Sequence, residues 1–559
     1  MLGTSHLQKT FAILSDTANQ AEIRRNFPKK SVERRNTGYA LDMLLDTAPF
    51  GGTAPFNMCR LIAGSEGTLC FLTEIKLHLI PPPPKAQALV CGHFDSIDEA
   101  LQATLIALKY KPQAVELIDN YVLECAAANP EQKANSFFVR NKPDGSYPTI
   151  LVVDLSREEQ AESIQLATAM EIEMREAGFG FHFPLLFDAD TKKIWTLRKA
   201  GLGLLANLPG DEKAVAVIED TAVDVHDQPA YIRDFNEILH KNGMSAVHYA
   251  HAGSGEIHLR PIINLKTKEG HRQFRMIAEE IATLVKKYDG SLSGEHGDGR
   301  LRGEFIPQMV GEKNYALFKE IKNTWDPDHV FNPGKIVDTP PMDTFLRYEA
   351  DQPSPELKTY FRYPNQTLLQ HAEQCNGSGD CRKTELSGGT MCPSFMATRN
   401  EKDTTRARAN ILREFLTNPH LPNREAIKEE AVKEVYDLCL ACKGCKGECP
   451  SNVDVAKLKM EFLQHYYDKN GVPLRSWLIG NFSKMTRLAS YMPWAYNFIF
   501  KNTPLRRMAN RIVGFHPDRT MPLLQNITLK KWGKSRKNSE KQAENDFIYF
   551  VMNFLTTMM

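Results

Sequence analysis

Short runs of β-branched and apolar residues alternate with amphipathic runs through the middle of the chain. The first pattern predicts strands at residues 88–91, 149–154, 214–219 and 246–250. Apolar residues at helical spacing predict helices at residues 96–109, 157–178, 228–242 and 270–288. Strands that alternate with helices within one segment indicate a layered α/β or α+β domain.

The flanking segments follow other patterns. Residues 59–80 carry apolar runs around a glycine pair and stop at four prolines, so we expect a strand, a glycine turn, a strand and a stiff linker. Residues 340–370 are rich in proline and polar residues and predict an interdomain linker. From residue 363 onward the pattern is helical, most strongly at residues 404–417 and 424–440.

Composition sets broad limits on function. The 559 residues are 42% hydrophobic and 25% charged, with a formal net charge of +1, which is typical of a globular protein and gives no general attraction to nucleic acid. The N-terminus lacks a signal-peptide pattern, and no apolar run reaches the roughly 18 residues of a membrane span. The last apolar run, residues 547–555, predicts a packed helix or a ragged end. We therefore expect a cytoplasmic protein, with the basic, tryptophan-containing residues 470–535 as a candidate contact with the inner membrane surface.

Four of the 11 cysteines have the spacing of an iron–sulfur ligand set. They read Cys439-x2-Cys442-x2-Cys445-x3-Cys449-Pro450, the run in which three thiolates hold one 4Fe-4S cluster and the fourth reaches a second cluster. A zinc site is the less favoured alternative, because zinc sites do not need a third cysteine at the same step or a final Cys-Pro. A 4Fe-4S cluster moves single electrons, so the chain or a partner must supply them.

An earlier cysteine group is irregular. It reads Cys375-x5-Cys381-x10-Cys392-Pro393. If each Cys-Pro cysteine crosses to the other cluster, Cys392 completes the set of Cys439, Cys442 and Cys445. Cys449 then joins Cys375 and Cys381, which leaves that cluster one thiolate short, as a three-iron cluster or with another ligand such as Asp380. We expect the remaining cysteines to pack in the core: Cys59, Cys70, Cys91 and Cys125.

Two loops framed by glycines contain histidines and a carboxylate that are candidate metal ligands. His251 and His258 flank a loop that follows the strand at residues 246–250, and Glu295 and His296 lie in the glycine-rich residues 293–299. Two imidazoles and one carboxylate form a three-ligand site for a divalent metal such as zinc or manganese, with an open position. A further neutral imidazole can take a proton. The alternative is that each histidine is an ordinary core or surface residue.

Five segments together resemble a known family. Residues 35–39, 61–69, 251–258, 293–299 and 331–335 occur in the order seen in FAD-linked oxidases of the vanillyl-alcohol-oxidase type. Within that group the chain is similar to D-2-hydroxy-acid dehydrogenases, and its cysteine-bearing half resembles the large bacterial D-2-hydroxyglutarate and D-lactate dehydrogenases that contain FAD and iron–sulfur clusters. The resemblance covers about residues 30–470.

The resemblance implies an α+β fold in several parts. Residues 1–84 correspond to the end of a FAD-binding domain, residues 85–340 to a ferredoxin-like substrate or cap domain, and residues 341–362 to a linker. Residues 363–470 correspond to a helical 4Fe-4S domain, and residues 471–559 form a basic and apolar helical tail. The family's phosphate-binding glycine loop would precede residue 35, so we expect that this chain is truncated and holds FAD poorly without further sequence.

The resemblance also implies roles for individual residues. His251, His258 and Glu295 would bind the metal, His296 would act as the base, Arg198 would bind the substrate carboxylate, and Lys213 would be a second cationic contact. The flavin would be lined by Asn36, Thr37, Gly38, Tyr39, Gly64, Ser65, Glu66, Gly67, Thr68 and Asn332.

These expectations combine into one predicted function. The chain would oxidise a D-2-hydroxy acid, D-2-hydroxyglutarate or D-lactate, to the 2-oxo acid, and electrons would pass from FAD to a 4Fe-4S cluster and on to a quinone or redox protein. A non-catalytic electron-transfer subunit and an oxygen-using oxidase, such as a glycolate oxidase subunit, are the alternatives.

Overall fold

The computed structural model describes residues 2–205, 208, 210–417, 427–525 and 527. The chain divides into two compact units, one of residues 1–358 and 362–456 and the other of residues 359–361 and 457–559. All predicted functional residues belong to the first unit. The domain boundaries expected from the sequence stay predictions.

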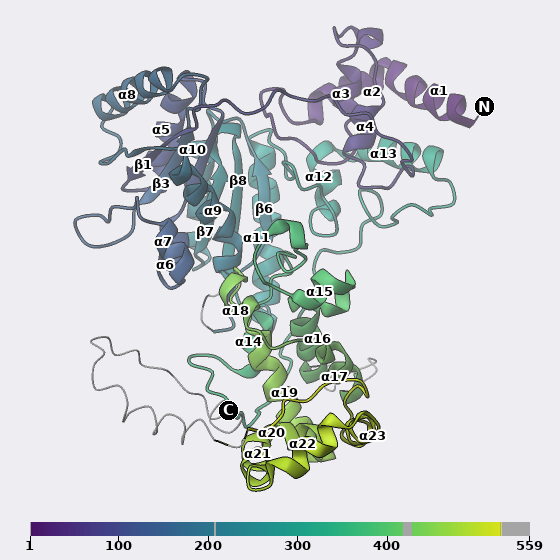
Figure 1. Ribbon diagram of the computed structural model, residues 1–559. Coiled ribbons are helices and arrows are strands. Elements are labelled where there is room, and N and C mark those ends of the chain that lie inside the picture. Colours follow the sequence, from purple (N-terminus) through teal and green to yellow (C-terminus); the bar gives the residue numbers. More distant parts are fainter. Residues whose placement is uncertain (1, 206–207, 209, 418–426, 526, 528–559) are drawn as a thin grey trace. The chain divides into compact units, whose positions relative to one another are not determined.

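An eight-stranded antiparallel sheet forms the centre of the first unit (Figure 1). Its order is β4-β1-β3-β2-β7-β8-β5, and β6 also pairs with β8. The strands are β1 Ala88–Phe94, β2 Ala114–Ile118, β3 Thr149–Asp154, β4 Leu185–Phe187, β5 Lys213–Ala214, β6 Ile218–Ala222, β7 Ala246–His251 and β8 Glu256–Ile263. The strand predicted at residues 214–219 is divided between β5 and β6, which pair with different parts of β8.

Helices cover both faces of the sheet, as the alternation of buried residues in β3 shows. Leu151 and Val153 join the apolar cluster with α5, α8, α10 and α11, whereas Ile150 and Val152 join a second cluster with α6 and α9. The helices of these layers are α5 Ile97–Lys109, α6 Asn120–Ala127, α7 Pro130–Asn135, α8 Gln160–Glu176, α9 Ala189–Leu204, α10 Gln228–Lys241 and α11 Lys268–Lys287. The four predicted helices of this region are confirmed, with Ser96 capping α5 through the backbone N–H of Glu99.

The N-terminal part is helical, and the strands predicted at residues 59–80 are wrong. This region contains α1 Leu2–Ser15, α2 Thr17–Asn26, α3 Leu41–Leu45 and α4 Cys59–Ala63, and it packs with α12 Ile306–Val310 and α13 Glu312–Trp325. Residues 71–80 form no strand, and Phe71, Leu77 and Leu79 are about 80% exposed. A strand needs a partner for its N–H and C=O groups, and the described residues provide none for this segment.

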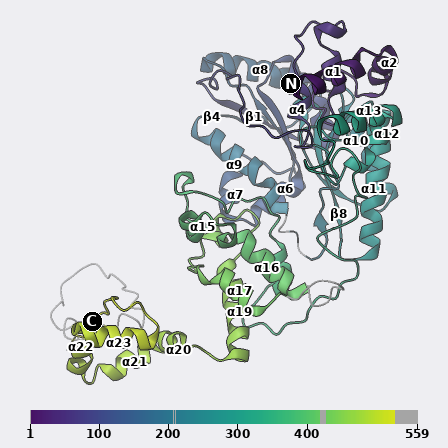
Figure 2. The same cartoon turned by 90° about the vertical axis from the view of Figure 1, so that its right-hand side faces the viewer.

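The cysteine-bearing segment of the first unit is helical, as predicted. It contains α14 Leu368–Glu373, α15 Pro393–Thr398, α16 Thr405–Thr417, α17 Glu429–Asp437 and α18 Gly444–Glu448. Figure 2 shows α15, α16 and α17 grouped together. The prediction of a helix at residues 424–440 is confirmed only for residues 429–437, and residues 424–426 lie outside the described part of the chain.

The second unit contains four further helices after α19 Val455–Asn470, which begins just before it: α20 Leu474–Gly480, α21 Phe482–Ala489, α22 Pro493–Lys501 and α23 Thr503–Val513. Among the described residues, no helix has the length and apolar character needed to cross a bilayer. The apolar run at residues 547–555 lies outside the described residues. The core packing expected for four cysteines is confirmed for Cys91, which is buried, and for Cys125, which is half-buried and packs against the same apolar cluster. Cys59 is exposed and Cys70 is half-buried.

Candidate functional site

The hairpin of β7 and β8 positions the two predicted metal-binding histidines. His251 ends β7 and His258 lies on β8 opposite Tyr249, so the register brings both imidazoles to the same end of the hairpin. Their ring centroids are 5.1 Å apart, with the rings nearly perpendicular. The short turn at Ala252–Ser254 leads into Gly255, whose φ of 73° suits glycine.

A buried carboxylate, Asp220, shapes the second loop. It accepts hydrogen bonds from the backbone N–H groups of Gly294, Glu295 and His296, each at 3.0 Å, and from the Ser293 hydroxyl. Burial alone would raise the pKa of Asp220, but a hydrogen bond with the Glu256 carboxyl, the Glu295 N–H and the nearby Arg302 hold it below its ordinary value. A negatively charged Asp220 thus fixes the loop that presents Glu295 and His296.

The structure brings the predicted metal ligands together. One ligand atom each of His251, His258 and Glu295 lies within 4.8 Å of the others, and Nε2 of His251 is 3.5 Å from Oε1 of Glu295. Nδ1 of His258 is buried without a hydrogen-bond partner. Burial and the charges of His251 and His296 lower the pKa of His258 to about 2, so its ring is neutral, as a metal ligand must be. These three side chains fit a divalent cation.

Two other groups that include His258 satisfy the same distance criterion. One consists of Glu219, His258 and His296, and the other of Asp220, Glu256 and His258. Burial and the neighbouring Asp220 carboxylate raise the pKa of Glu256 to about 9, so this acid is protonated near neutral pH and is a poor ligand. The set of His251, His258 and Glu295 leaves His296 available for proton transfer.

His296 lies beside the cluster with an accessible ring. Its imidazole stacks on that of His258, with centroids 5.3 Å apart and planes 9° from parallel, and its side chain is 45% exposed. Nε2 of His296 is 3.6 Å from Oε1 of Glu295. An exposed imidazole next to a metal-binding set is well placed to exchange a proton with a bound molecule.

Arg198 reaches the cluster through Glu116, a residue that the sequence patterns did not identify. Glu116 lies on β2, and its carboxylate accepts from Nε of Arg198 at 3.1 Å and lies 2.8 Å from Nδ1 of His251. The Arg198 guanidinium also covers the ring of Tyr249, 4.9 Å from its centroid. The planar guanidinium therefore borders the predicted metal site.

Arg34 was also missed, and it faces the same set from the N-terminal part. Its guanidinium is paired with Glu295 and lies 3.3 Å from Oε2 of Glu256. Arg34 lines one cavity together with Glu116 and His251, so a second carboxylate-bound cation borders the histidines. Nothing in the sequence marked either residue, because both are single charged residues without a motif.

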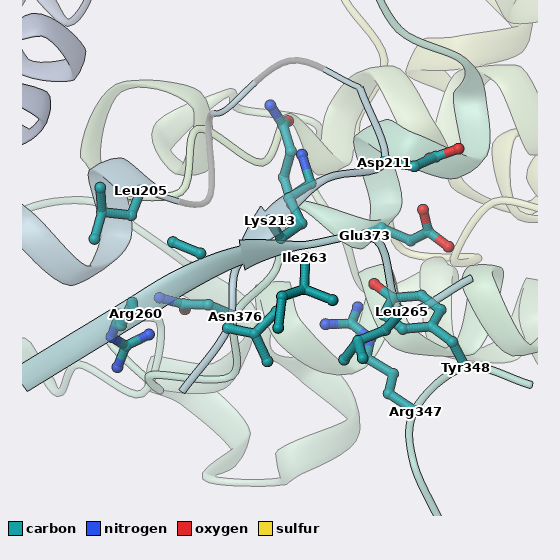
Figure 3. Close-up of a pocket in the computed structure, with 13 residues that line it drawn as sticks. Leu205, Asp211, Lys213, Arg260, Ile263, Leu265, Arg347, Tyr348, Glu373 and Asn376 are labelled. Carbon is teal, nitrogen blue, oxygen red and sulfur yellow. The ribbon is translucent and has the colours of Figure 1, made fainter. Parts of the chain in front are cut away.

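Lys213 lines a neighbouring cavity of about 210 Å³ (Figure 3). This cavity lies between the ends of β5 and β8 and the segment that carries Cys375, and its cations are Lys213, Arg260 and Arg347. Nζ of Lys213 donates to the Leu208 carbonyl, and burial lowers its pKa. Among the described residues no contact joins Lys213 to the histidines, so its role as a substrate contact stays a prediction.

The predicted flavin segments meet around the loop at residues 293–299. The Gly38 N–H donates to Asp298 at 2.6 Å, the Asp298 N–H donates to Glu66 at 2.6 Å, and Nδ2 of Asn332 donates to the Glu66 carbonyl at 2.7 Å. Gly297 has a φ of 80°, which suits glycine, and a Cβ there would lie 2.9 Å from the Glu66 carboxylate, so another residue would be strained and would displace Glu66.

Several of these side chains are already paired internally. The hydroxyls of Tyr39 and Thr68 bond to each other at 2.7 Å, and those of Thr37 and Ser291 at 3.0 Å, all four residues being buried. Asn36 and Asn332 remain accessible, and Asn36 joins this segment to the metal loop through the Glu295 carbonyl. The residues present fit a flavin through backbone groups and these two amides.

The cysteines separate into two groups. Cys392, Cys439, Cys442 and Cys445 line one common cavity, together with Thr405 and Arg408. Cys449 lies within electrostatic range of Cys375 and Cys381. This arrangement has the crossed pattern of a two-cluster site, in which each Cys-Pro cysteine joins the other group.

Comparisons with known proteins agree with this division. Residues 83–336 match the family described as FAD linked oxidases, C-terminal domain, which indicates FAD, and residues 374–454 match the 4Fe-4S dicluster domain, which indicates iron–sulfur clusters. The chain is 28% identical over 535 residues to D-2-hydroxyglutarate dehydrogenase of Escherichia coli (strain K12), covering 88% of this chain and 51% of that protein. It is 30% identical over 522 residues to the enzyme of the same name from Pseudomonas putida, covering 86% and 50%.

The chain therefore spans about half the length of the curated relatives it matches. A shorter match, 25% identical over 283 residues, is D-lactate dehydrogenase of Archaeoglobus fulgidus, covering 50% of this chain and 58% of that protein. Among solved structures, p-cresol methylhydroxylase aligns with a TM-score of 0.33 and 12% identity, over 44% of this chain and 52% of that one.

Proposed function

We propose that this chain provides the substrate-binding and iron–sulfur parts of a FAD-linked dehydrogenase that oxidises a D-2-hydroxy acid, with D-2-hydroxyglutarate as the first candidate and D-lactate as the second. One observation carries the proposal: Glu116 joins Arg198 to the cluster of His251, His258, Glu295 and His296, so a carboxylate-binding group borders a set of metal ligands and a base. The names of the relatives support the same substrate class.

The residues divide the work by their chemistry. Arg198 binds the substrate carboxylate through parallel N–H groups of its planar guanidinium. In doing so it gives up part of its contact with Glu116. The imidazole of His296 takes the α-hydroxyl proton at its accessible edge. FAD, when bound, would supply the acceptor for the electron pair. His251, His258 and Glu295 would hold a divalent metal, whose chemistry there would be to lower the pKa of the hydroxyl.

The two cysteine groups provide the exit for electrons. They belong to the same unit as the histidine cluster, and Pro450, next to Cys449, contacts Gly203 on the helix that carries Arg198. We propose a quinone or a redox protein as the final acceptor. Cysteines with metal-ligand spacing suit a reducing compartment, which supports a cytoplasmic location.

The test is a dye-reduction assay. The chain is reconstituted anaerobically with FAD, iron and sulfide, and is tested with the D and L forms of 2-hydroxyglutarate and lactate, and with glycolate. Because the chain spans about half of its relatives, a polypeptide extended upstream is tested in parallel. We expect dye reduction with a D-2-hydroxy acid and none with its L form.

A matched pair of variants tests the substrate-binding role of Arg198. Arg198→Gln should raise the KM about 100-fold, because a charged hydrogen-bond pair is lost, whereas Lys199→Gln, at the next and exposed position of the same helix, should leave KM unchanged. Two outcomes contradict the proposal. If the extended protein binds its clusters but reduces no dye, it is an electron-transfer subunit. If it forms hydrogen peroxide in proportion to the substrate consumed, it is an oxidase.

A further inference from the structure

We propose that the second cluster is held by only three thiolates, those of Cys375, Cys381 and Cys449, and that Ser378 occupies the position of the absent fourth cysteine. One iron of this cluster is therefore bound without a thiolate and is exchangeable. The inference rests on the iron–sulfur clusters of the proposed function. It adds the identity of the residue that stands where the fourth cysteine ligand would be.

The two cysteine loops have the same spacing when Ser378 is counted. Cys439, Cys442 and Cys445 are three residues apart, and so are Cys375, Ser378 and Cys381. A cysteine at the middle position of such a loop is a cluster ligand. Ser378 is the one member of this pattern that carries oxygen instead of sulfur.

The backbone of the two loops also agrees. In the later loop, the residues on either side of the middle position, Ala441 and Lys443, have φ of 53° and 62°. In the earlier loop, the corresponding residues, Gly377 and Gly379, both have φ of 82°. Positive φ on both sides of the middle residue thus occurs in both loops, at two non-glycine residues in the later loop and at two glycines, which adopt it without strain, in the earlier one.

Burial agrees at two of the three positions, whereas at the first position Cys375 is buried and Cys439 is half-buried. The third position is buried in both loops, with Cys381 5% and Cys445 8% exposed. The middle position is exposed in both, at Ser378 and at Cys442. The structure thus places Ser378 where the later loop presents its most accessible thiolate.

The other three ligands of this group are gathered around the start of α16. The Cys381 thiol accepts from the backbone N–H groups of Thr405 and Arg406, and the Arg406 guanidinium lies within electrostatic range of Cys381 and Cys375. The Cys449 thiol accepts from the backbone N–H groups of Ser451 and Val453. Burial raises the pKa of the Cys381 and Cys449 thiols, so the geometry and not the titration is what matters here: backbone N–H groups already point at both sulfur atoms, as they do at the sulfur ligands of a cluster.

The Ser378 corner differs in its chemistry. Its hydroxyl donates to Oδ2 of Asp380 at 2.7 Å, so the nearest groups at this corner are oxygens. Iron in a cluster prefers thiolate, and a serine hydroxyl gives up its proton far less readily than a thiol. The iron at this corner is consequently the one that leaves first.

Mild oxidation in the presence of a chelator should remove that iron. One Fe²⁺ leaves the cluster, breaking its bonds to three sulfides, and is bound by the chelator. The remaining three-iron cluster gives one electron to ferricyanide, which becomes ferrocyanide. The oxidised three-iron cluster is detected by its EPR signal, and the released iron is measured in the chelate.

The experiment compares variants of the full chain after anaerobic reconstitution. Wild type should release about one iron ion per chain and gain the three-iron EPR signal, while Ser378→Cys should release about none and lack that signal. Cys442→Ser gives the later loop the same Cys, Ser, Cys order at its three positions. This variant should release about two iron ions per chain. Ser378→Ala should release about one iron ion per chain, as wild type does. This variant tests the inference even if Ser378→Cys fails to fold.

Two results would overturn the inference. In the first, wild type keeps all its iron under conditions that release iron from Cys442→Ser. In the second, Ser378→Cys forms the three-iron signal with the amplitude of wild type. Neither measurement uses a hydroxy acid, so failure of the dehydrogenase assay and failure of this test are separate outcomes.

Discussion

The carboxylate of Glu116 lies 2.8 Å from Nδ1 of His251, although the two residues are 135 positions apart in the chain. Because a carboxylate can only accept, Nδ1 donates to Glu116, which leaves Nε2 as the nitrogen that faces Glu295, 3.5 Å away. Glu116 therefore selects the tautomer of His251 that can bind a metal.

Replacing Glu116 by glutamine should weaken metal binding. The uncharged amide cannot fix the tautomer of His251 as a carboxylate does. Loss of a carboxylate partner of a metal-binding histidine typically lowers the metal affinity about 10- to 100-fold. Titration of the FAD-free chain with Zn²⁺ or Mn²⁺, followed by calorimetry, measures the affinity. Glu176→Gln, at an exposed position of α8, serves as the control and should bind as wild type does.

Asp220→Asn should destabilise the loop that carries Glu295 and His296. The asparagine keeps one acceptor oxygen but turns its NH2 group toward backbone N–H donors, so at least one buried donor is left unpaired. We expect the free energy of unfolding to fall by about 2–3 kcal/mol in urea titrations. An effect no larger than that of Asp328→Asn, a change at an exposed position, would show that Asp220 does not organise the loop.

His93 should make the fold sensitive to mild acid. Its Nε2 accepts from the Arg140 N–H, and its Nδ1 lies 2.8 Å from the Cys91 carbonyl, so the buried ring is neutral. Burial, with the nearby His182, lowers its pKa to about 4. Stability from this group is complete above about pH 6.5 and is lost as the pH falls toward 4, because acid protonates the unfolded chain first.

This group should contribute a loss of about 1.6 kcal/mol between pH 6.5 and pH 5, because the slope is half of 1.36 kcal/mol per pH unit at the unfolded pKa and approaches the full value below it. Chemical denaturation of wild type and His93→Gln at both pH values measures the difference. The variant should lose less stability on acidification than wild type, while His240→Gln, at an exposed position, should follow wild type. Parallel pH curves for all three proteins would exclude His93 as the source.

Gly203→Ala should disturb the cysteine-bearing segment. A Cβ at Gly203 would lie 2.2 Å from Cβ of Pro450, which adjoins Cys449, so α9 or the cysteine must shift. We expect a loss of about 1–3 kcal/mol in stability and a changed EPR spectrum of the reconstituted clusters.

The control for this change lies on the same helix. A Cβ at Gly201 meets only Val122, at 3.5 Å, and alanine favours helix, so Gly201→Ala should be neutral or slightly stabilising. Equal behaviour of the two variants would mean that the contact between α9 and Pro450 is unimportant for the cluster.

Local patterns predicted the elements whose stability is local. The helix at residues 97–109 has its cap in Ser96, and the strand at residues 149–154 is a short continuous run of β-branched and apolar residues that is buried from residue 149 to residue 153. Glu116 and Asp220 could not be found in this way. Their roles depend on which strands are neighbours, and β2 lies between β3 and β7, strands that come from residues 149–154 and 246–251.

The site shows the same limit. Glycine-framed motifs identified His251, His258, Glu295 and His296, and the structure places them within one cluster. Cysteine spacing predicted that Cys392 belongs with the later group, and it lines their cavity. The strands expected at residues 59–80 failed because alternation gives the face of a strand but cannot provide the strand beside it.

Residues 71–80 combine alternating apolar side chains with backbone groups that have no strand partner among the described residues. Such a segment is a template for pairing with an identical segment of another molecule, which is the first step of fibre formation. In concentrated solution this polypeptide should therefore self-associate through residues 71–80. Cooling should slow the process, since the attraction between apolar surfaces weakens at low temperature.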